Sequence, residues 1–332
     1  MPLIVQKFGG TSVADEAARA CLAAKAAEAR ARGDEVVLVV SAMGRRGASY
    51  ATDTLLDLLR GFDPDPVPLA SDLLASCGEV ISACLVSALL RAKGIPSVPM
   101  TAYTAGIRAE GPFQDARPLG ADAEAIRAVL GAGAVPVITG FQAVGPGGQL
   151  LTLGRGGSDT SAVLVGLALQ ADYVDIYTDV PGVAKADPRI IPEAPFMDFL
   201  DYGSMSRLAA LGAKVLHDKS AFLAESGGAI LRVRSTFDSG EGTLIGPAGA
   251  PGRSAPDFVG LALSKDGSER ARVGAVFASG RGAALKARAE RAASALGCSP
   301  IPQGDPDASI FSCEQARSGE LARALFEAIE GA

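Results

Sequence analysis

The chain opens with a short apolar run that leads directly into two glycines: Leu3-Ile4-Val5-Gln6-Lys7-Phe8-Gly9-Gly10-Thr11-Ser12-Val13. We expect Leu3–Lys7 to form a buried strand, because the run is short, apolar and bounded by glycine. An Ala-rich helix is predicted over Asp15–Arg32 and a second apolar strand over Glu35–Ser41. Apolar strands that alternate with helices indicate a mostly parallel sheet covered on both faces. The fold class is therefore α/β.

This alternation continues to residue 246 and then stops. Further buried strands are predicted at Val135–Phe141 and Tyr173–Thr178. Residues 247–256 are rich in proline, glycine and alanine, which is typical of a linker. Residues 257–332 have room for one small sheet and two helices. We therefore predict a large domain over 1–246 and a small α+β domain over 257–332.

Composition excludes several classes of protein. The formal net charge of the 332 residues is −6 and no long run of Lys or Arg occurs, so a nucleic-acid partner is not expected. The mean hydropathy is +0.25, but apolar runs such as Val36–Val40 are far shorter than a membrane span. Met1–Val5 lacks the pattern of a signal peptide. We expect a cytoplasmic protein with no membrane partner.

The cysteine and histidine counts limit the chemistry further. The five cysteines fit no zinc-site spacing, so they are expected to be buried thiols in a reducing compartment. No metal site made of protein side chains is predicted. His217 is the only histidine, which leaves one candidate for any reaction that needs a histidine base.

The first segment that could carry chemistry is Lys7–Val13. Its glycines allow backbone N–H groups to face a phosphate, and Lys7 supplies positive charge for a transferred phosphoryl group. The spacing matches neither the P-loop nor the dinucleotide fingerprint. The alternative is a strand-to-helix turn that needs glycine for its shape alone.

The second segment is Leu153–Ser161, with the sequence LGRGGSDTS. Ser158 is predicted to cap a helix, and Asp159 in the first turn suits the helix dipole. Arg155 lies among three glycines, where its guanidinium could bind a carboxylate through two parallel hydrogen bonds. The alternative is a helix start without a ligand.

The third segment is Val174–Val183, in which a buried strand ends at Thr178. Ligands of open parallel sheets lie at the carboxyl ends of strands, so Asp179 and Arg189 lie where a nucleotide would bind. Pro181-Gly182 alone is equally typical of a turn. A separate signal is Glu79, a charged residue inside an apolar predicted helix, which is unusual unless it is exposed or functional.

Three segments of the chain resemble the signature segments of the aspartokinases, in the amino-acid kinase superfamily: Lys7–Val13, Leu153–Ser161 and Thr178–Gly182. Ser41–Asp53 and Ile230–Thr236 resemble the diaminopimelate-sensitive branch in particular. The resemblance covers roughly residues 1–246. It implies a three-layer amino-acid kinase fold and transfer of the γ-phosphate of Mg-ATP to the side-chain carboxylate of L-aspartate. This reaction is the first step of the aspartate pathway, which leads to lysine by way of diaminopimelate, and also to threonine and to methionine.

The resemblance also implies roles for individual residues. The phosphates of ATP would be held by Lys7, Gly9, Gly10 and Ser12, with Ser41 nearby. The aspartate pocket would consist of Thr52, Glu79, Arg155 and Asp159, and Lys7 and Asp159 would be the catalytic residues. The nucleotide or its metal would contact Thr178, Asp179, Arg189 and Lys214. A carboxylate nucleophile is already ionised at neutral pH, so the reaction needs no histidine base.

The chain departs from the family pattern at several positions. Ala48-Ser49 stands where this branch is expected to carry Asp-Pro, Ala184 where many relatives carry a larger residue, and Asp218-Lys219 where proline is commoner. These changes would weaken ATP binding, but they leave the central charged positions intact.

The C-terminal region departs further. Aspartokinases usually end in two ACT modules, whereas 257–332 resembles a single degenerate ACT-like domain. Ser279–Gly282 lacks the expected effector loop, and Pro300–Ala308 replaces an apolar strand. We therefore expect weak or absent feedback by lysine, threonine or diaminopimelate, and a homodimer formed through this domain.

Three alternative functions stay open. The first is a kinase of another small acid, such as acetylglutamate, glutamate or carbamate. The second is a non-catalytic regulatory subunit or amino-acid sensor, although Lys7, Glu79, Arg155 and Asp159 are all present. The third is an aspartate kinase that serves a specialised pathway.

Overall fold

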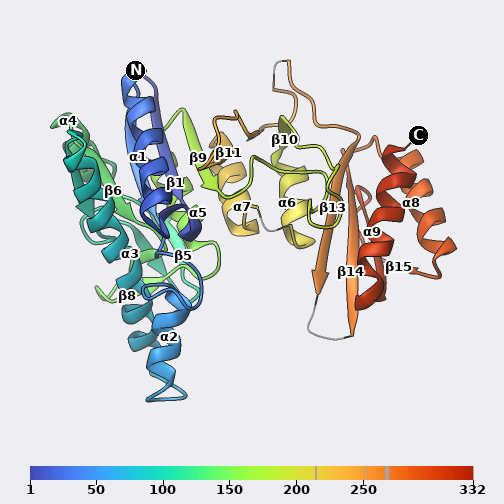
Figure 1. The fold of residues 1–332 in the computed structure, drawn as a ribbon, viewed down its shortest axis with the longest axis horizontal. Helices are drawn as coiled ribbons and strands as arrows, with labels where there is room; N and C mark the ends of the chain where they lie inside the picture. The colour runs from blue at the N-terminus through green and yellow to red at the C-terminus, as the bar shows by residue number, and fades with distance from the viewer. Residues whose placement is uncertain (214, 251, 266–268, 332) are drawn as a thin grey trace. The chain divides into compact units, whose positions relative to one another are not determined.

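The computed structural model describes residues 1–213, 215–250, 252–265 and 269–331 (Figure 1). The chain forms two compact units, one from residues 1–181 and 226–241, the other from 182–225 and the residues from 242 onward.

The two units do not follow the predicted boundary at residues 247–256. Ala186, Ile191 and Ala194 share a hydrophobic core with C-terminal strands and helices, so the segment 182–225 packs with the C-terminal region. A linker rich in glycine marks a change of composition, whereas packing depends on where apolar side chains meet. The assignment of 1–246 as the catalytic domain stays a prediction.

A parallel sheet forms the centre of the first unit. Its strands lie in the order β11-β9-β1-β2-β6-β3. Their bounds are β1 Leu3–Phe8, β2 Glu35–Val40, β3 Ser97–Met100, β6 Val135–Thr139, β9 Tyr173–Thr178 and β11 Leu231–Ser235. Every pairing among these strands is parallel, and β1 lies between β2 and β9. The predicted buried parallel sheet is confirmed.

Helices cover both faces of this sheet. Their bounds are α1 Glu16–Ala31, α2 Thr52–Arg60, α3 Pro68–Ala92, α4 Ala123–Gly131 and α5 Gly157–Leu169. Phe8 of β1 packs in one core with Leu22 of α1 and Leu90 of α3. Its neighbour Lys7 points to the opposite face, because side chains alternate along a strand, and meets Asp159 of α5 there. The result is the predicted three-layer arrangement.

A second, smaller sheet in the first unit was not predicted. It runs in the order β5-β4-β7-β8. The bounds are β4 Arg108–Glu110, β5 Arg117–Gly120, β7 Gln142–Val144 and β8 Leu150–Thr152. Each strand has only three or four residues, too few to show a periodic pattern in the sequence.

The second unit contains an antiparallel sheet in the order β13-β14-β16-β15. Its elements are β13 Phe258–Lys265, β14 Arg270–Phe277, α8 Ala283–Ala295, β15 Ser299–Ile301, β16 Ala308–Glu314 and α9 Ser318–Glu330. The second unit also contains β10 Phe199–Asp201, α6 Tyr202–Ala210, most of α7 Asp218–Gly227, and β12 Thr243–Gly246. Pro300–Ala308 was expected to lack a strand, but Ile301 pairs with Ile310, so a short strand forms there.

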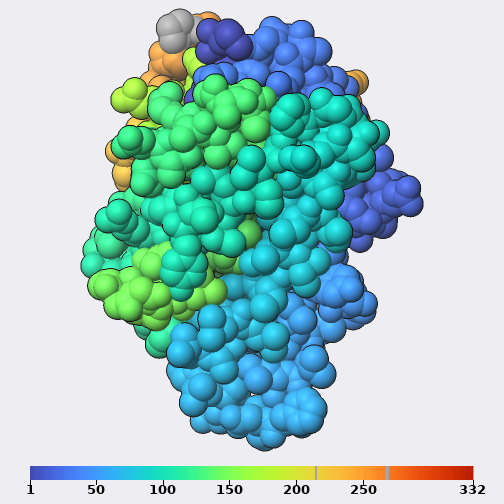
Figure 2. Space-filling view, turned by 90° about the vertical axis from the view of Figure 1, so that its left-hand side faces the viewer, coloured from blue at the N-terminus to red at the C-terminus, as the bar shows by residue number. Residues whose placement is uncertain are grey.

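α3 is the one described helix that is long and apolar enough to cross a membrane, with 25 residues and a mean hydropathy of 2.0 in its most apolar window. The expectation that every apolar run falls far short of a span was therefore wrong for α3. Half of that window is buried inside the structure. In the space-filling view, α2 and the beginning of α3, in light blue, form the lower end of the visible face (Figure 2).

Candidate active site

The first unit contains an open cleft of about 510 Å³. Seven of the predicted site residues line it: Lys7, Gly10, Ser41, Thr52, Glu79, Arg155 and Asp159. They come from the ends of β1 and β2, the start of α2, the middle of α3 and the start of α5. Segments far apart in the sequence thus meet at the carboxyl ends of central parallel strands, where α/β folds bind ligands.

Lys7 and Asp159 form a buried ion pair at the cleft. Lys7 Nζ lies 2.6 Å from Asp159 Oδ1, and each residue is only 9% exposed. Asp159 lies in the first turn of α5, where the helix dipole favours negative charge. The pair holds the ammonium group of Lys7 in a fixed place beside the space that a ligand would occupy.

Gly10 allows two loops of the cleft to approach each other closely. A Cβ at this position would lie 2.6 Å from the carbonyl oxygen of Gly44. The N–H of Gly44 donates a hydrogen bond of 2.9 Å to the carbonyl oxygen of Gly10. The second glycine of the N-terminal motif is therefore needed for this contact between the loops after β1 and β2.

Glu79 is buried against the same loop and is only half satisfied. The N–H of Ala42 donates to Glu79 Oε1 at 3.0 Å, whereas Oε2 has no hydrogen-bond partner in the described parts of the chain. Gly78 makes the approach possible, because a Cβ there would lie 2.6 Å from Ala42 Cβ. Burial raises the pKa of Glu79 to about 8, and the bond from Ala42 opposes this shift in part. A cationic ligand would favour the ionised form.

Arg155 is held by two glycines in left-handed conformation. Gly154 has φ +73° and Gly156 has φ +70°, values that residues with a Cβ rarely adopt. Arg155 is exposed, lines the cleft and makes no ion pair with any residue that the structure describes. Its guanidinium is therefore available to an anionic ligand.

The helix after Arg155 starts earlier than predicted. Gly156 is its N-cap and α5 begins at Gly157, so Ser158 is not the cap. Ser158 instead packs against Gly140. A Cβ added at Gly140 would lie only 2.7 Å from the Cβ of Ser158. The left-handed Gly156 ends the preceding turn before the chain reaches the serine.

Five predicted nucleotide contacts do not line the cleft: Gly9, Ser12, Thr178, Asp179 and Arg189. The hydroxyl of Ser12 is buried and hydrogen-bonded to that of Thr236 at 2.6 Å. Asp179 pairs with Arg45, a residue of the cleft wall, at 3.0 Å. Arg189 belongs to the second unit and bonds Asp187 there. Lys214 lies outside the described residues.

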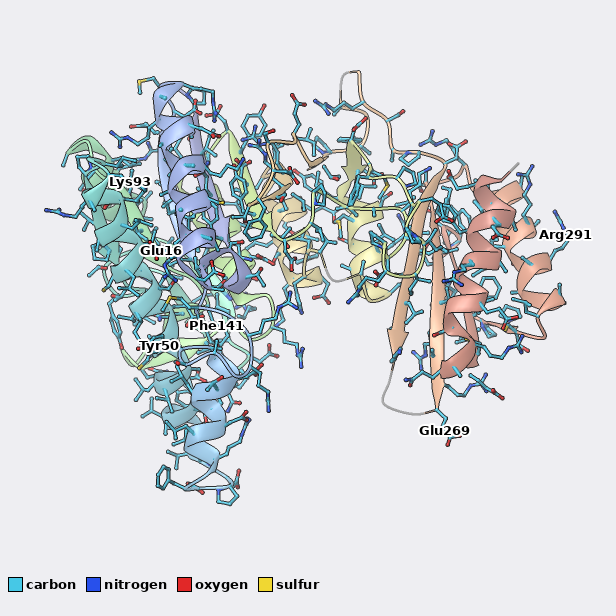
Figure 3. All side chains as sticks on the ribbon, viewed as in Figure 1. Glu16, Tyr50, Lys93, Phe141, Glu269 and Arg291 are labelled. Atoms are coloured by element: carbon cyan, nitrogen blue, oxygen red, sulfur yellow. The ribbon has the colours of Figure 1, made fainter. Side chains whose placement is uncertain are left out.

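The structure adds cleft residues that the motifs did not single out, among them Arg45, Arg46, Asp53 and Phe141. Phe141, which Figure 3 labels, has φ +68°, an uncommon conformation for a residue with a Cβ. The predicted strand Val135–Phe141 ends at Thr139, because the backbone turns at Phe141. The adjacent Arg45 and Arg46 could have been identified from the sequence as candidates for binding an anion. The unusual backbone conformation of Phe141 could not be predicted from the sequence.

A protein-only metal centre is not assembled in the described part of the chain. No group of three or more His, Cys, Asp or Glu side chains gathers closely enough to hold an ion among those residues. Asp159 is the carboxylate of the cleft nearest to Lys7, and Asp179 lies beside Arg45 at the end of β9.

Comparison with known proteins agrees with this geometry. Residues 2–235 match the model of the Amino acid kinase family. Aspartokinase 1 of Bacillus subtilis is 41% identical over 245 residues, which are 74% of this chain and 61% of that protein. The structure of aspartate kinase from Synechocystis is 32% identical, with a TM-score of 0.65, over 98% of this chain and 56% of that one.

A more distant structure shares the fold over its whole length. Aspartokinase III of Escherichia coli, in complex with aspartate and ADP, gives a TM-score of 0.78 at 20% identity, covering 99% of this chain and 100% of that one. The chain spans about three fifths of the length of the curated relatives it matches. The family match includes every residue that lines the cleft, and the chain belongs to the amino acid kinase family.

Proposed function

We propose that the chain is an aspartate kinase, which transfers the γ-phosphate of ATP to the β-carboxylate of L-aspartate and forms 4-phospho-L-aspartate. The observation that carries the proposal is the grouping of three features in one cleft. These are the Lys7–Asp159 pair, the half-satisfied Glu79, and Arg155, which has no ion-pair partner among the described residues. The relatives at about 41% identity are aspartokinases.

The charges in the cleft complement those of aspartate. The substrate has one ammonium group and two carboxylates. Oε2 of Glu79 would accept a hydrogen bond from the ammonium group, and Arg155 would bind one carboxylate with two parallel bonds. Holding the second carboxylate in line with a phosphoryl group then needs no acid or base, since the nucleophile is already ionised.

Lys7 would stabilise the charge that develops on the transferred phosphoryl group. Its Nζ is already fixed by Asp159, so little reorganisation is needed during the reaction. The loops at Gly10 and Ser41 supply backbone close to the same space. Thr52 belongs to the proposed aspartate pocket, whereas Gly9, Ser12, Thr178, Asp179, Arg189 and Lys214 stay predicted nucleotide contacts.

Mg²⁺ is part of the proposal through the nucleotide. When bound, it would neutralise phosphate charge, and in such sites it commonly keeps several waters and takes only one or two protein carboxylates. Asp159 in the cleft, and Asp179 beside the cleft-wall residue Arg45, are compatible with that mode. We place the reaction in the cytoplasm, at the head of the lysine, threonine and methionine pathways.

The proposal includes a homodimer through the C-terminal ACT-like domain and weak feedback by end-product amino acids. The weak feedback is supported by the loop Ser279–Gly282, which is tied to the chain's own carboxylate. Asp307 accepts hydrogen bonds from Ser279 Oγ at 2.8 Å and from the N–H of Gly280 at 3.0 Å. Side-chain bonding by Ser279, with further help from Arg207 and Gly280, lowers the pKa of Asp307.

An ATP-dependent hydroxamate assay tests the proposed reaction. The protein is given Mg-ATP, L-aspartate and hydroxylamine beside Arg155→Ala and a control, Arg108→Ala, an exposed arginine outside the cleft. We expect hydroxamate from the wild type and the control and strongly reduced product from Arg155→Ala. Turnover of glutamate, acetylglutamate or carbamate but not aspartate would establish another acid kinase. Nucleotide binding without any turnover would favour a sensor.

A further inference from the structure

Two buried cysteines of the second unit face each other across neighbouring strands of its antiparallel sheet. Cys298 directly precedes β15, and Cys313 lies in β16 (Figure 1). In this antiparallel ladder, Ser299 pairs with Ser312. The next position outward along the ladder places Cys298 opposite Cys313. The two residues are 6% and 4% exposed and belong to one hydrophobic core, so their side chains lie on the same face of the sheet.

The hydrogen-bond pattern of this ladder brings the two cysteine side chains close. Antiparallel pairs alternate between hydrogen-bonded and non-hydrogen-bonded. Pro300 faces Phe311 and has no N–H to donate, so that pair is non-hydrogen-bonded. The cysteine pair, two positions along, has the same character, and the N–H of Cys298 donates instead to the carbonyl oxygen of Ala293 at 2.9 Å. Non-hydrogen-bonded pairs have Cα atoms about 4.5 Å apart, within the range of roughly 4.4–6.8 Å that a disulfide requires.

Two arginines lie beside the cysteine pair. Arg270 Nε donates to Ser312 Oγ at 2.8 Å, in the position next to Cys313. Arg317 Nη1 donates at 3.2 Å to the backbone carbonyl oxygen two residues before Cys298. Burial and the neighbouring Cys298 raise the pKa of the Cys313 thiol, and the two arginines oppose this shift. Because the thiolate is the reactive form and Cys313 stays protonated to higher pH, we expect Cys298 to react with an oxidant first.

The pair differs in geometry from the two cysteines of α3. Cys77 and Cys84 are exposed but seven residues apart on one helix, a rise of about 10 Å, which is too far for a disulfide. Cys298 adjoins the edge strand of its sheet, where a small oxidant can reach a thiol that is nearly buried. A single buried thiol commonly serves as a small apolar side chain, whereas two thiols opposite each other in one core are also within bonding reach.

We propose that Cys298 and Cys313 form a redox site, in which a peroxide converts the two thiols into a reversible disulfide. Hydrogen peroxide oxidises the sulfur of Cys298 to a sulfenic acid, and the second peroxide oxygen leaves as water. The sulfur of Cys313 then attacks the sulfenic sulfur, the S–S bond forms, and the sulfenic oxygen leaves as water. Two thiols and one peroxide thus give one disulfide and two waters, and a dithiol reductant restores the thiols. This site lies beyond the proposed kinase reaction and does not depend on it.

The disulfide closes a loop that anchors α6. Residues 299–312 lie between the two cysteines and include Asp305 and Asp307. Both carboxylates accept hydrogen bonds from Arg207 of α6, at 2.8 and 3.0 Å. A cross-link over this loop restricts the unfolded chain more than the folded one. Oxidation should therefore stabilise the second unit and hold both carboxylates in place against Arg207.

Mass spectrometry of the full chain tests the site. Cys21→Ser, Cys77→Ser and Cys84→Ser are combined, so that Cys298 and Cys313 are the remaining thiols. Hydrogen peroxide should lower the mass of this protein by two hydrogen atoms, and dithiothreitol should restore it. Adding Cys298→Ser to the same background gives the matched control, which should lose no hydrogen. In the wild type, proteolysis without reductant should yield one pair of peptides joined through both cysteines, so the test does not depend on the folding of a variant.

Thermal unfolding supplies a second readout. The oxidised protein should have a Tm about 5 °C or more above that of the reduced protein, and peroxide should not raise the Tm of the control. Two thiols that both remain free to alkylation after peroxide treatment would overturn the proposal. So would oxygen added to each cysteine without a link, a link between two chains in place of one within a chain, or a disulfide that leaves the Tm unchanged.

Discussion

Two buried acidic residues on α3 lie in opposite chemical situations. Asp72 and Glu79 are seven residues apart, about two turns, and are 0% and 2% exposed. Asp72 accepts hydrogen bonds from the N–H groups of Gln114 and Thr152 and from the hydroxyl of Thr152, at 3.2, 2.7 and 3.1 Å. Glu79 accepts one, from Ala42, and its second oxygen has no partner among the described residues.

The comparison separates a structural carboxylate from a binding one. Burial raises the pKa of both groups, but at Asp72 three hydrogen bonds oppose the shift, whereas at Glu79 the pKa reaches about 8. An unpaired buried acceptor is costly, so it persists where a ligand completes it. Asp72 ties α3 to β8 and to the Gln114 loop, whereas Glu79 faces the cleft.

The largest expected difference between the two carboxylates is in their effect on activity. Glu79→Gln keeps the shape of the side chain but removes the charge that would bind the substrate ammonium group. We expect kcat/KM for aspartate to fall roughly 100- to 1,000-fold, mostly through KM, since truncating a buried charge pair costs about 2–5 kcal/mol. Steady-state kinetics with purified protein measure the effect.

Asp72→Asn is the matched control for that measurement. It changes an equally buried carboxylate on the same helix face by the same chemistry, and its kcat/KM should fall less than tenfold. Equal losses in the two variants would contradict the separation of roles, because both acids would then act through the structure of α3.

The second prediction concerns stability, for which we expect Asp72→Asn to have a larger effect than Glu79→Gln, the opposite of their order for kcat/KM. In Asp72→Asn, one oxygen becomes an NH₂ group that faces N–H donors, so buried groups lose their partners. We expect the free energy of unfolding to fall by about 1–3 kcal/mol, which denaturant titration would measure. Glu79→Gln should be no less stable than the wild type near neutral pH, because it removes a poorly satisfied buried acid.

The sequence predicted the part of the site that local patterns encode. Lys7 follows an apolar run and precedes two glycines, and Arg155 lies among glycines, so both signals are contiguous. The parallel sheet then brings strand ends together by its topology. Lys7 and Arg155 line one cleft because the alternation of strands and helices makes the sheet parallel, and the carboxyl ends of parallel strands lie at the same edge.

Other features depend on contacts between distant segments and could not be predicted. The sequence around Ser12 does not show that its hydroxyl forms a hydrogen bond with Thr236, which is 224 positions away. In the same way, the sequence around Asp72 does not show that its carboxylate accepts a hydrogen bond from Thr152, which is 80 positions away. Residues 182–225 pack with the C-terminal strands for the same reason, because their apolar side chains carry no sign of which core they join.

The third prediction uses the pH dependence of stability. The pKa of Glu79 is raised to about 8 in the folded state and is near 4.5 when unfolded, so between these values the folded state binds more protons. The contribution of Glu79 to stability is therefore most favourable below pH 4.5, declines as pH rises toward 8, and then levels off.

Measured from pH 6 to 8, the free energy of unfolding of the wild type should decline relative to Glu79→Gln by at most roughly 1.4 kcal/mol per pH unit. Aspartate should reduce this decline in the wild type, because its ammonium group favours the ionised carboxylate. Parallel curves for the two proteins would show that Glu79 does not titrate in this range.

The smallest expected effect is that of Thr152→Val, which removes one of the three donors to Asp72 and keeps the side-chain shape. Oδ1 of Asp72 then loses its hydroxyl partner, while the N–H of Thr152 still bonds Oδ2. We expect a loss of about 1 kcal/mol in stability with unchanged kcat/KM, as Thr152 does not line the cleft. A change in KM for aspartate without a change in stability would mean that the hydrogen bonds of Asp72 position the cleft. The number of hydrogen bonds that a buried carboxylate accepts would then not by itself separate structural carboxylates from functional ones.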